Sequence, residues 1–168
     1  MNRTKFTVGE DKKTLVVERQ FAATKSNVWR AYTDPELLRQ WWGPKGWTTD
    51  IKHMDFSVGG YWHYCMRCID KSQGDFFGME SWGKGTYTGI SPEDSFSYDD
   101  EFCDERGNAL PGMPMAHVTI SLTAEKGSTL LTCTSRYDTA DALTQVLEMG
   151  MEQGFTQTLD NLETVLSW

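Results

Sequence analysis

The amino-acid sequence predicts an α+β fold. A curved antiparallel sheet of six to seven strands wraps around one long C-terminal helix, and two short helices follow the first strand. Apolar residues recur every three or four positions over residues 140–168, which is the period of an amphipathic helix. Over residues 47–137 the apolar period is two and short turns separate the segments, which indicates an antiparallel meander.

The first strand is expected over residues 14–22, which alternate and are rich in Val, Phe and Leu. Arg19 shares the face of the strand's apolar residues, so an inward face would bury a charge that needs a partner. We therefore expect Arg19 to be either edge-facing or salt-bridged. Of the two short helices that follow, the second starts at Asp34-Pro35-Glu36 and ends at Gly43-Pro44.

Six further strands are predicted at residues 47–55, 61–70, 77–90, 95–103, 115–124 and 129–137. In the second of these we assign one alternating set to the inner face: Trp62, Tyr64, Met66 and Cys68. The facing of residues 77–90 stays open, because Trp82 and Tyr87 have opposite parity and without a bulge only one can point inward.

Two glycines interrupt the apolar stripe of the C-terminal helix. Gly150 and Gly154 lie four residues apart, and each costs about 1 kcal/mol relative to alanine in a helix interior. One explanation is close packing, in which a bulky aromatic of the sheet presses against bare backbone; protein interiors usually fill to near-crystal density. The other is that the missing side chains leave a void that holds a ligand.

Composition narrows the class of protein. The 168 residues suit a single domain over residues 14–168, preceded by an N-terminal tail over residues 1–13. A net charge of −8 argues against nucleic-acid binding, which needs a basic surface. No stretch has the length and hydropathy of a membrane span or of a targeting signal, so we expect a cytoplasmic protein.

The four cysteines predict neither a disulfide scaffold nor a metal centre. Cys65 and Cys68 spell C-x-x-C, but residues three apart on a strand point to opposite faces and do not converge on one ion. No second pair at zinc-site spacing accompanies them. We therefore expect no metal and no cofactor.

A sheet that curls around one helix leaves its concave side partly filled, which favours a small-molecule cavity between them. We expect this cavity to bind a hydrophobic or aromatic small molecule. Trp41 and Trp42 could gate its mouth or simply cap one end of the sheet. The predicted ligand-binding residues are Trp62, Tyr64, Met66, Phe96, Tyr98, Gly150, Met151, Gly154, Phe155, Trp41 and Trp42.

The order of several motifs, from about Leu15 to Leu166, resembles one family, the bacterial activator of heat-shock-protein-90 ATPase homologues. This family belongs to the START-like, birch-pollen-allergen-like (SRPBCC) superfamily. The resemblance implies a helix-grip fold and a cavity for an apolar or aromatic molecule, in a protein with a stress-related role; it implies no shared catalytic residues. The motifs are Arg19, Val28-Trp29, Thr33-Asp34-Pro35-Glu36, Trp41-Trp42-Gly43-Pro44, Asp55, Val58-Gly59-Gly60, Gly85-Thr86-Tyr87, Gly150-Met151, Gly154 and Leu159-Asp160-Asn161-Leu162.

Two other functions stay open. A cyclase- or hydrolase-like enzyme would use the same cavity, with proton-transfer groups drawn from His53, His117, Tyr64, Asp100 and Arg19. An interaction module would use exposed aromatics such as Tyr61 or Trp168 to contact a chaperone or a second copy in a homodimer. No motif in the sequence supports the chaperone contact.

Overall fold

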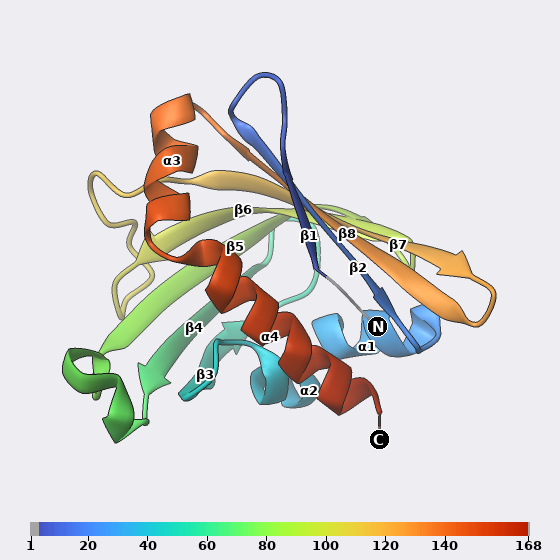
Figure 1. Cartoon of the computed structure of the whole chain (residues 1–168), viewed down its shortest axis with the longest axis horizontal. Coiled ribbons are helices and arrows are strands. Elements are labelled where there is room, and N and C mark those ends of the chain that lie inside the picture. The colour runs from blue at the N-terminus through green and yellow to red at the C-terminus, as the bar shows by residue number, and fades with distance from the viewer. Residues whose placement is uncertain (1–3, 168) are drawn as a thin grey trace.

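The computed structural model describes residues 4–167, within which eight strands form one antiparallel, unclosed sheet (Figure 1). The order across the sheet is β1-β2-β8-β7-β6-β5-β4-β3, so β3 to β8 form the predicted meander and β2 joins it beside β8. The strands are β1 (Lys5–Val8), β2 (Thr14–Phe21), β3 (Trp47–Met54), β4 (Tyr61–Cys68), β5 (Glu80–Ser91), β6 (Ser95–Cys103), β7 (Ala116–Glu125) and β8 (Ser128–Tyr137).

Helices cover the concave face of this sheet, with α4 crossing it and α1 and α2 at one end (Figure 1). This arrangement is the helix-grip α+β fold that the sequence predicts. Trp168 lies outside the described residues. The helices are α1 (Lys25–Thr33), α2 (Pro35–Trp41), α3 (Ala140–Glu148) and α4 (Met151–Leu166), and a 3₁₀ helix, η1 (Lys71–Phe76), lies between β4 and β5.

The sheet has one strand more than expected, because β1 forms within the segment that we expected to be a tail. It pairs antiparallel with β2, from Lys5 opposite Glu18 to Val8 opposite Leu15. Asp11 fixes the connecting turn by accepting hydrogen bonds from the backbone of Lys13 (2.9 Å) and Thr14 (3.1 Å). Four mostly exposed residues give no periodic signal, so the sequence did not reveal this edge strand.

Strand β2 is tied to the helix across the sheet by ion pairs of a buried arginine. Arg19, 3% exposed, lies 2.6 Å from Asp160 and 3.4 Å from Glu163, both on α4. Of the two expectations for Arg19, the structure shows the salt bridge on a buried side chain. It explains how an arginine can share the inward face of a strand whose other inward side chains are apolar.

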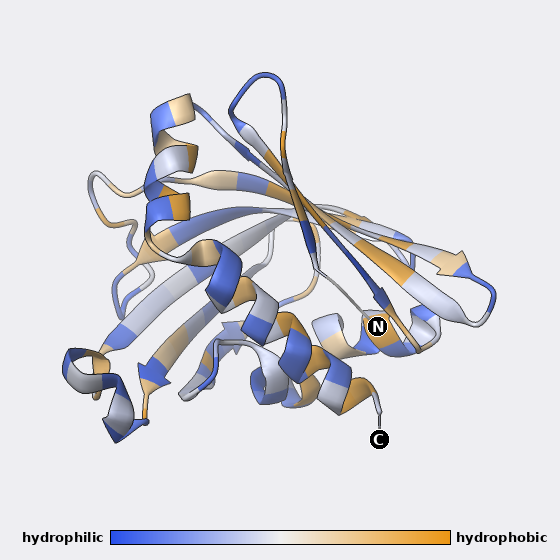
Figure 2. Ribbon diagram, in the orientation of Figure 1, coloured by the Kyte–Doolittle hydropathy of each residue, from blue (hydrophilic) through white to orange (hydrophobic). Residues whose placement is uncertain are grey.

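The structure has a long C-terminal helix, α4, but the prediction that one continuous helix starts at residue 140 is wrong. The C-terminal segment breaks into α3 and α4 at Gly150, whose φ of +84° lies in the left-handed region. Glycine adopts this conformation without a steric penalty, so the chain turns here and α3 lies at an angle to α4 (Figure 1). Both helices keep an apolar stripe toward the sheet, which is why one period seemed to run through them (Figure 2).

The open question of β5 is resolved by its glycines. Gly83, Gly85 and Tyr87 are buried on the inner face, whereas Trp82 is on the other face and half-buried. A bulge between Tyr87 and Gly89 shifts the register toward the end of the strand. The inner face of β5 therefore carries almost no side chains where it passes beneath α4.

Candidate ligand-binding cavity

Three adjoining cavities lie between the sheet and the α3–α4 segment. The mouth cavity has a volume of about 730 Å³, the middle cavity about 290 Å³ and the inner cavity about 180 Å³. Phe102 of β6 lines all three. The middle and inner cavities also share Trp42, Val146, Met151 and Phe155.

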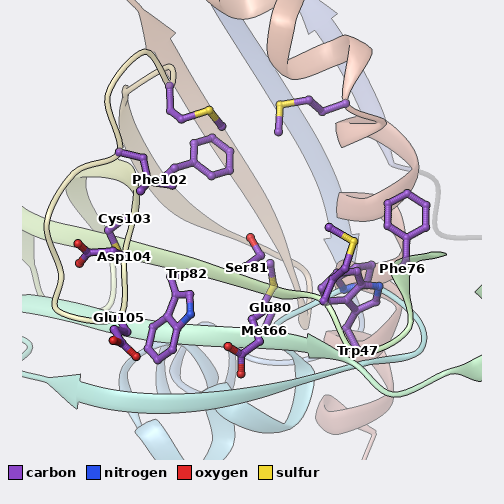
Figure 3. A pocket seen from close by; sticks show the side chains of 15 residues that line it. Trp47, Met66, Phe76, Glu80, Ser81, Trp82, Phe102, Cys103, Asp104 and Glu105 are labelled. Atoms are coloured by element: carbon purple, nitrogen blue, oxygen red, sulfur yellow. The ribbon is translucent and has the colours of Figure 1, made fainter.

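The mouth cavity opens to solvent between η1, the loop after β6 and the end of α3. In Figure 3, Trp47 and Phe76 stand on one side of it and Phe102 and Cys103 on the other. Its rim is unusually apolar for a solvent-facing surface. The exposed apolar residues of the rim are Phe76, Met79, Leu110 and Met149.

The middle cavity lies beside the break between α3 and α4. A Cβ added at Gly150 would meet no atom within 4 Å, and one at Gly154 would meet only Cβ of Pro44, at 4.0 Å. The close-packing explanation of these glycines is therefore wrong. Gly150 serves the left-handed turn, and Gly154 leaves open space in the wall of the cavity.

Aromatic packing on glycine does occur, but on the sheet. A Cβ on Gly83 would lie 2.4 Å from the Tyr64 ring, and one on Gly85 would lie 2.9 Å from the Tyr98 ring. The two tyrosine rings thus pack directly against bare β5 backbone. Because the rings lie close to the β5 backbone, more space remains between the sheet and α4, and the cavity occupies this space.

The inner cavity contains one carboxylate, that of Asp100 on β6. Its cross-strand neighbours are Gly85 and Ala116, whose small size leaves space around it. Burial first, and then the nearby charge of Glu101, raises the pKa of Asp100 to about 7. Throughout residues 4–167 no hydrogen bond to this carboxylate is found, so it faces the cavity unpartnered.

Three phenol groups lie close enough to Asp100 to interact with its charge, those of Tyr64, Tyr98 and Tyr137. Burial first, and then the charge of Asp100, raises the pKa of both the Tyr64 and the Tyr137 phenol, so both stay protonated at neutral pH. The pKa of Tyr98 is raised by the same two causes. The hydroxyl of Tyr32, which interacts electrostatically with Tyr98, is buried and has no hydrogen-bond partner within the described chain. The inner end of the site thus presents a carboxyl group and phenol hydroxyls among otherwise mainly apolar side chains.

The structure brings most of the predicted ligand-binding residues together but not all. Trp41 is fully buried and donates from Nε1 to the carbonyl of Ala31 (2.9 Å), so it cannot gate the mouth. Trp62 and Phe96 pack in the aromatic core and line none of the three cavities. The predicted residues that line the cavities are Trp42, Tyr64, Met66, Tyr98, Gly150, Met151, Gly154 and Phe155.

Of the five candidate proton-transfer groups, only Tyr64 and Asp100 line the cavities. His53 stacks on Tyr61 with ring centroids 4.3 Å apart, and His117 lies 2.8 Å from Asp99, a neighbour of Asp100 that points to the opposite face. Cyclase- or hydrolase-like activity therefore stays a prediction that depends on Tyr64 and Asp100. In the part of the chain that the structure describes, no three His, Cys, Asp or Glu side chains gather as a metal site would require.

Sequence reasoning missed several lining residues. Phe102 continues the alternation of Phe96 and Tyr98, so the pattern could have placed it in the site. Leu110 and Met113 lie in a loop whose path has no periodic signal. Loop residues of this kind can be placed only by the structure.

The fold defines the class of protein, a helix-grip protein of the SRPBCC type. The sequence model of one family, described as activator of Hsp90 ATPase homolog 1-like protein, matches residues 22–167. The chain belongs to this family. None of the curated proteins compared with the chain matches it.

Solved structures agree with this assignment. Protein Ms6760 from Mycobacterium smegmatis is 28% identical, with a TM-score of 0.86 over 99% of this chain and 97% of that one. A protein from Arthrobacter aurescens is also 28% identical, with a TM-score of 0.87 over 97% and 91%. The AHSA1 protein from Silicibacter pomeroyi shares the fold, at 22% identity and a TM-score of 0.68 over 92% and 97%. Among residues 4–167, no helix has the length and apolar character to cross a membrane.

Proposed function

We propose that this protein binds a hydrophobic or aromatic small molecule in the cavity between its sheet and the α3–α4 segment. The middle cavity is lined mainly by aromatic, aliphatic and methionine side chains, as ligand pockets usually are. It adjoins a larger, solvent-open mouth through Pro44, Met66, Phe102 and Met149, which gives a molecule a route inward. Membership of a helix-grip family is consistent with such a role but does not specify a ligand.

The observation that carries the proposal is the open space at Gly154. A glycine in the fourth position of α4 lowers helix stability by about 1 kcal/mol relative to alanine. No packing contact requires it, because a Cβ would meet only Pro44 at ordinary contact distance. Packing does not explain Gly154, whereas the cavity does, because any side chain at this position would make the cavity shallower.

Filling the cavity from α4 tests the proposal. We expect Gly154→Leu to weaken binding of the uncharged fluorescent probe Nile red by at least about tenfold, a loss of about 1.4 kcal/mol, because the new side chain occupies the middle cavity. Gly154→Ala should weaken binding less. The matched control is Glu152→Leu, which adds the same side chain at an exposed position of α4 outside the three cavities.

Probe affinity is measured by fluorescence titration, and folding by thermal unfolding of each variant. Equal affinity of folded Gly154→Leu and wild-type protein would refute the proposed site. Absence of any probe binding to the wild-type protein would refute the function itself. A native mass spectrum of protein purified from its own host would in addition show any retained ligand and the subunit count.

A further inference from the structure

We propose that the ligand of this cavity is an apolar amine, with its ammonium group paired to Asp100 in the inner cavity and its hydrocarbon or aromatic body directed toward the mouth. This inference rests on the proposed function and specifies the chemical class of the ligand. It comes from the charges that line the three cavities and from the surroundings of Asp100.

The charged side chains that line the three cavities are all acidic. Glu80, Asp104 and Glu105 line the mouth, and Asp100 lies inside. Among the described residues, no basic side chain lines any of the three cavities, and the nearby Arg67 is paired with Glu80. A fatty acid or other anion would therefore meet only like charges, whereas the acidic lining and the net charge of −8 attract a cation.

Asp100 differs from the carboxylates at the mouth because it has no partner. Glu80 pairs with Arg67, and Asp104 accepts hydrogen bonds from the backbone of Arg106 (2.8 Å) and Asn108 (2.9 Å). Asp100 accepts none in the described residues. A buried carboxylate is stable in its charged form only when it is paired, and an ammonium group supplies both the opposite charge and strong hydrogen bonds.

The walls around Asp100 also suit a cation. Tyr98 and Tyr137 line the inner cavity with it, and Tyr64 lies close enough for its ionisation to be affected by the Asp100 charge. Aromatic faces attract ammonium groups, by about 0.5–1 kcal/mol at exposed sites and more where water is excluded. A carboxylate among aromatic rings combines the two features by which proteins recognise amines.

The body of the ligand would lie toward the mouth. Phe102 lines all three cavities, from the inner one to the mouth. At the mouth, flexible thioether side chains are contributed by Met66, Met113 and Met149. Methionine adapts to ligands of different shape and contacts aromatic rings favourably. The polar end of the site is thus the inner one, which predicts that the ligand enters with its ammonium group first.

Three probes with the same ring system test the charge preference: 1-naphthylmethylamine, 1-naphthylmethanol and 1-naphthoate. By calorimetry at pH 8, we expect the amine to bind wild-type protein at least about tenfold more tightly than the carboxylate, with the alcohol between them. Asp100→Asn should weaken amine binding by about tenfold or more and change alcohol binding less than about threefold. The matched control, Asp99→Asn, removes the same charge from the opposite face of β6 and should leave amine affinity unchanged.

A pH series on the wild-type protein tests the same inference without a variant. The amine stays protonated below pH 8, so its affinity should rise about tenfold from pH 5.5 to pH 8 as Asp100 ionises, while alcohol affinity stays constant. Besides the charge of Glu101, five titratable groups interact with Asp100, and burial raises the pKa of each of the five, so these five stay neutral over this range. They are Tyr64, Tyr98, Cys103, Cys133 and Tyr137.

Each outcome decides between the two proposals. Equal binding of amine and carboxylate, or an amine affinity that Asp100→Asn leaves unchanged, would overturn the amine inference. If the alcohol and Nile red still bind in that case, the cavity function stands without it. If no naphthalene probe and no Nile red binds, both proposals fail.

Discussion

At the scale of single residues, the glycines of this protein serve three different purposes. Gly83 makes room for a tyrosine ring, Gly150 adopts a left-handed conformation, and Gly154 borders open space. The sequence shows the same letter each time. Only the backbone angle and the neighbouring atoms separate the three, and each purpose predicts a different response to alanine.

The two helix glycines should respond to alanine with opposite signs. Gly154→Ala should raise the free energy of unfolding by about 0.5–1 kcal/mol, because alanine favours the helix and its Cβ meets no close neighbour. Gly150→Ala should lower it by about 1 kcal/mol, because a φ of +84° strains an L side chain despite the open space around it. Urea unfolding measures both changes. Stabilisation by both substitutions would mean that the break between α3 and α4 is not fixed by Gly150.

At the scale of elements, the sequence predicted most of the sheet and missed its edge and the helix break. Alternation identified strands such as β6, in which Phe96 and Tyr98 lie on one buried face. β1 was missed because its residues are mostly exposed. The break was missed because α3 and α4 each turn apolar residues toward the same sheet, so the apolar period alone does not register a change of axis.

The packing of α4 on β2 depends on the pairing of Arg19. Its side chain is only 2% exposed, whereas Asp160 is 59% exposed and Glu163 45%, so the desolvated partner is the arginine. We expect Asp160→Asn to lower the free energy of unfolding by about 1–2 kcal/mol, less than the 3–5 typical of a fully buried pair, because Asp160 is solvated and Glu163 remains nearby.

Urea unfolding of Asp160→Asn at neutral pH checks this expectation. The control is Glu148→Gln, which removes a negative charge from an exposed position at the end of α3. That substitution should change the free energy of unfolding by no more than about 0.5 kcal/mol. Equal effects of the two variants would show that the ion pair does not hold α4 to the sheet.

At the scale of the whole molecule, the cavity results from several elements acting together. β5 supplies bare backbone, α3 and α4 meet at an angle, and the loop after β6 completes the mouth. Sequence reasoning could expect a cavity from the fold and place several lining residues from strand parity. It could not predict that Asp100 would lack a partner, because that depends on Gly85 and Ala116 standing beside it on other strands.

A half-buried carboxylate without a hydrogen-bond partner should make the stability of the molecule depend on pH in an unusual direction. In the unfolded chain an aspartate ionises near pH 3.9, whereas Asp100 in the folded protein holds its proton up to about pH 7. Between these values the folded state binds more protons than the unfolded state. The contribution of Asp100 to stability therefore falls as pH rises from about 4 to 7 and stays low above that.

Asp100→Asn should remove this pH dependence. We expect the free energy of unfolding of the variant, relative to that of wild-type protein, to increase by about 1–2 kcal/mol between pH 5 and pH 8. This increase is smaller than the whole pKa shift implies, because the carboxyl keeps partial exposure to the cavity. Urea unfolding at both pH values measures the difference, with the exposed Asp75→Asn as the control that should show no such increase. A relative stability that is the same at pH 5 and pH 8 would mean that Asp100 is solvated or already paired in the folded protein. An added amine that binds the cavity should reduce this increase in relative stability. Its ammonium group stabilises the ionised carboxylate, which only the wild-type protein has.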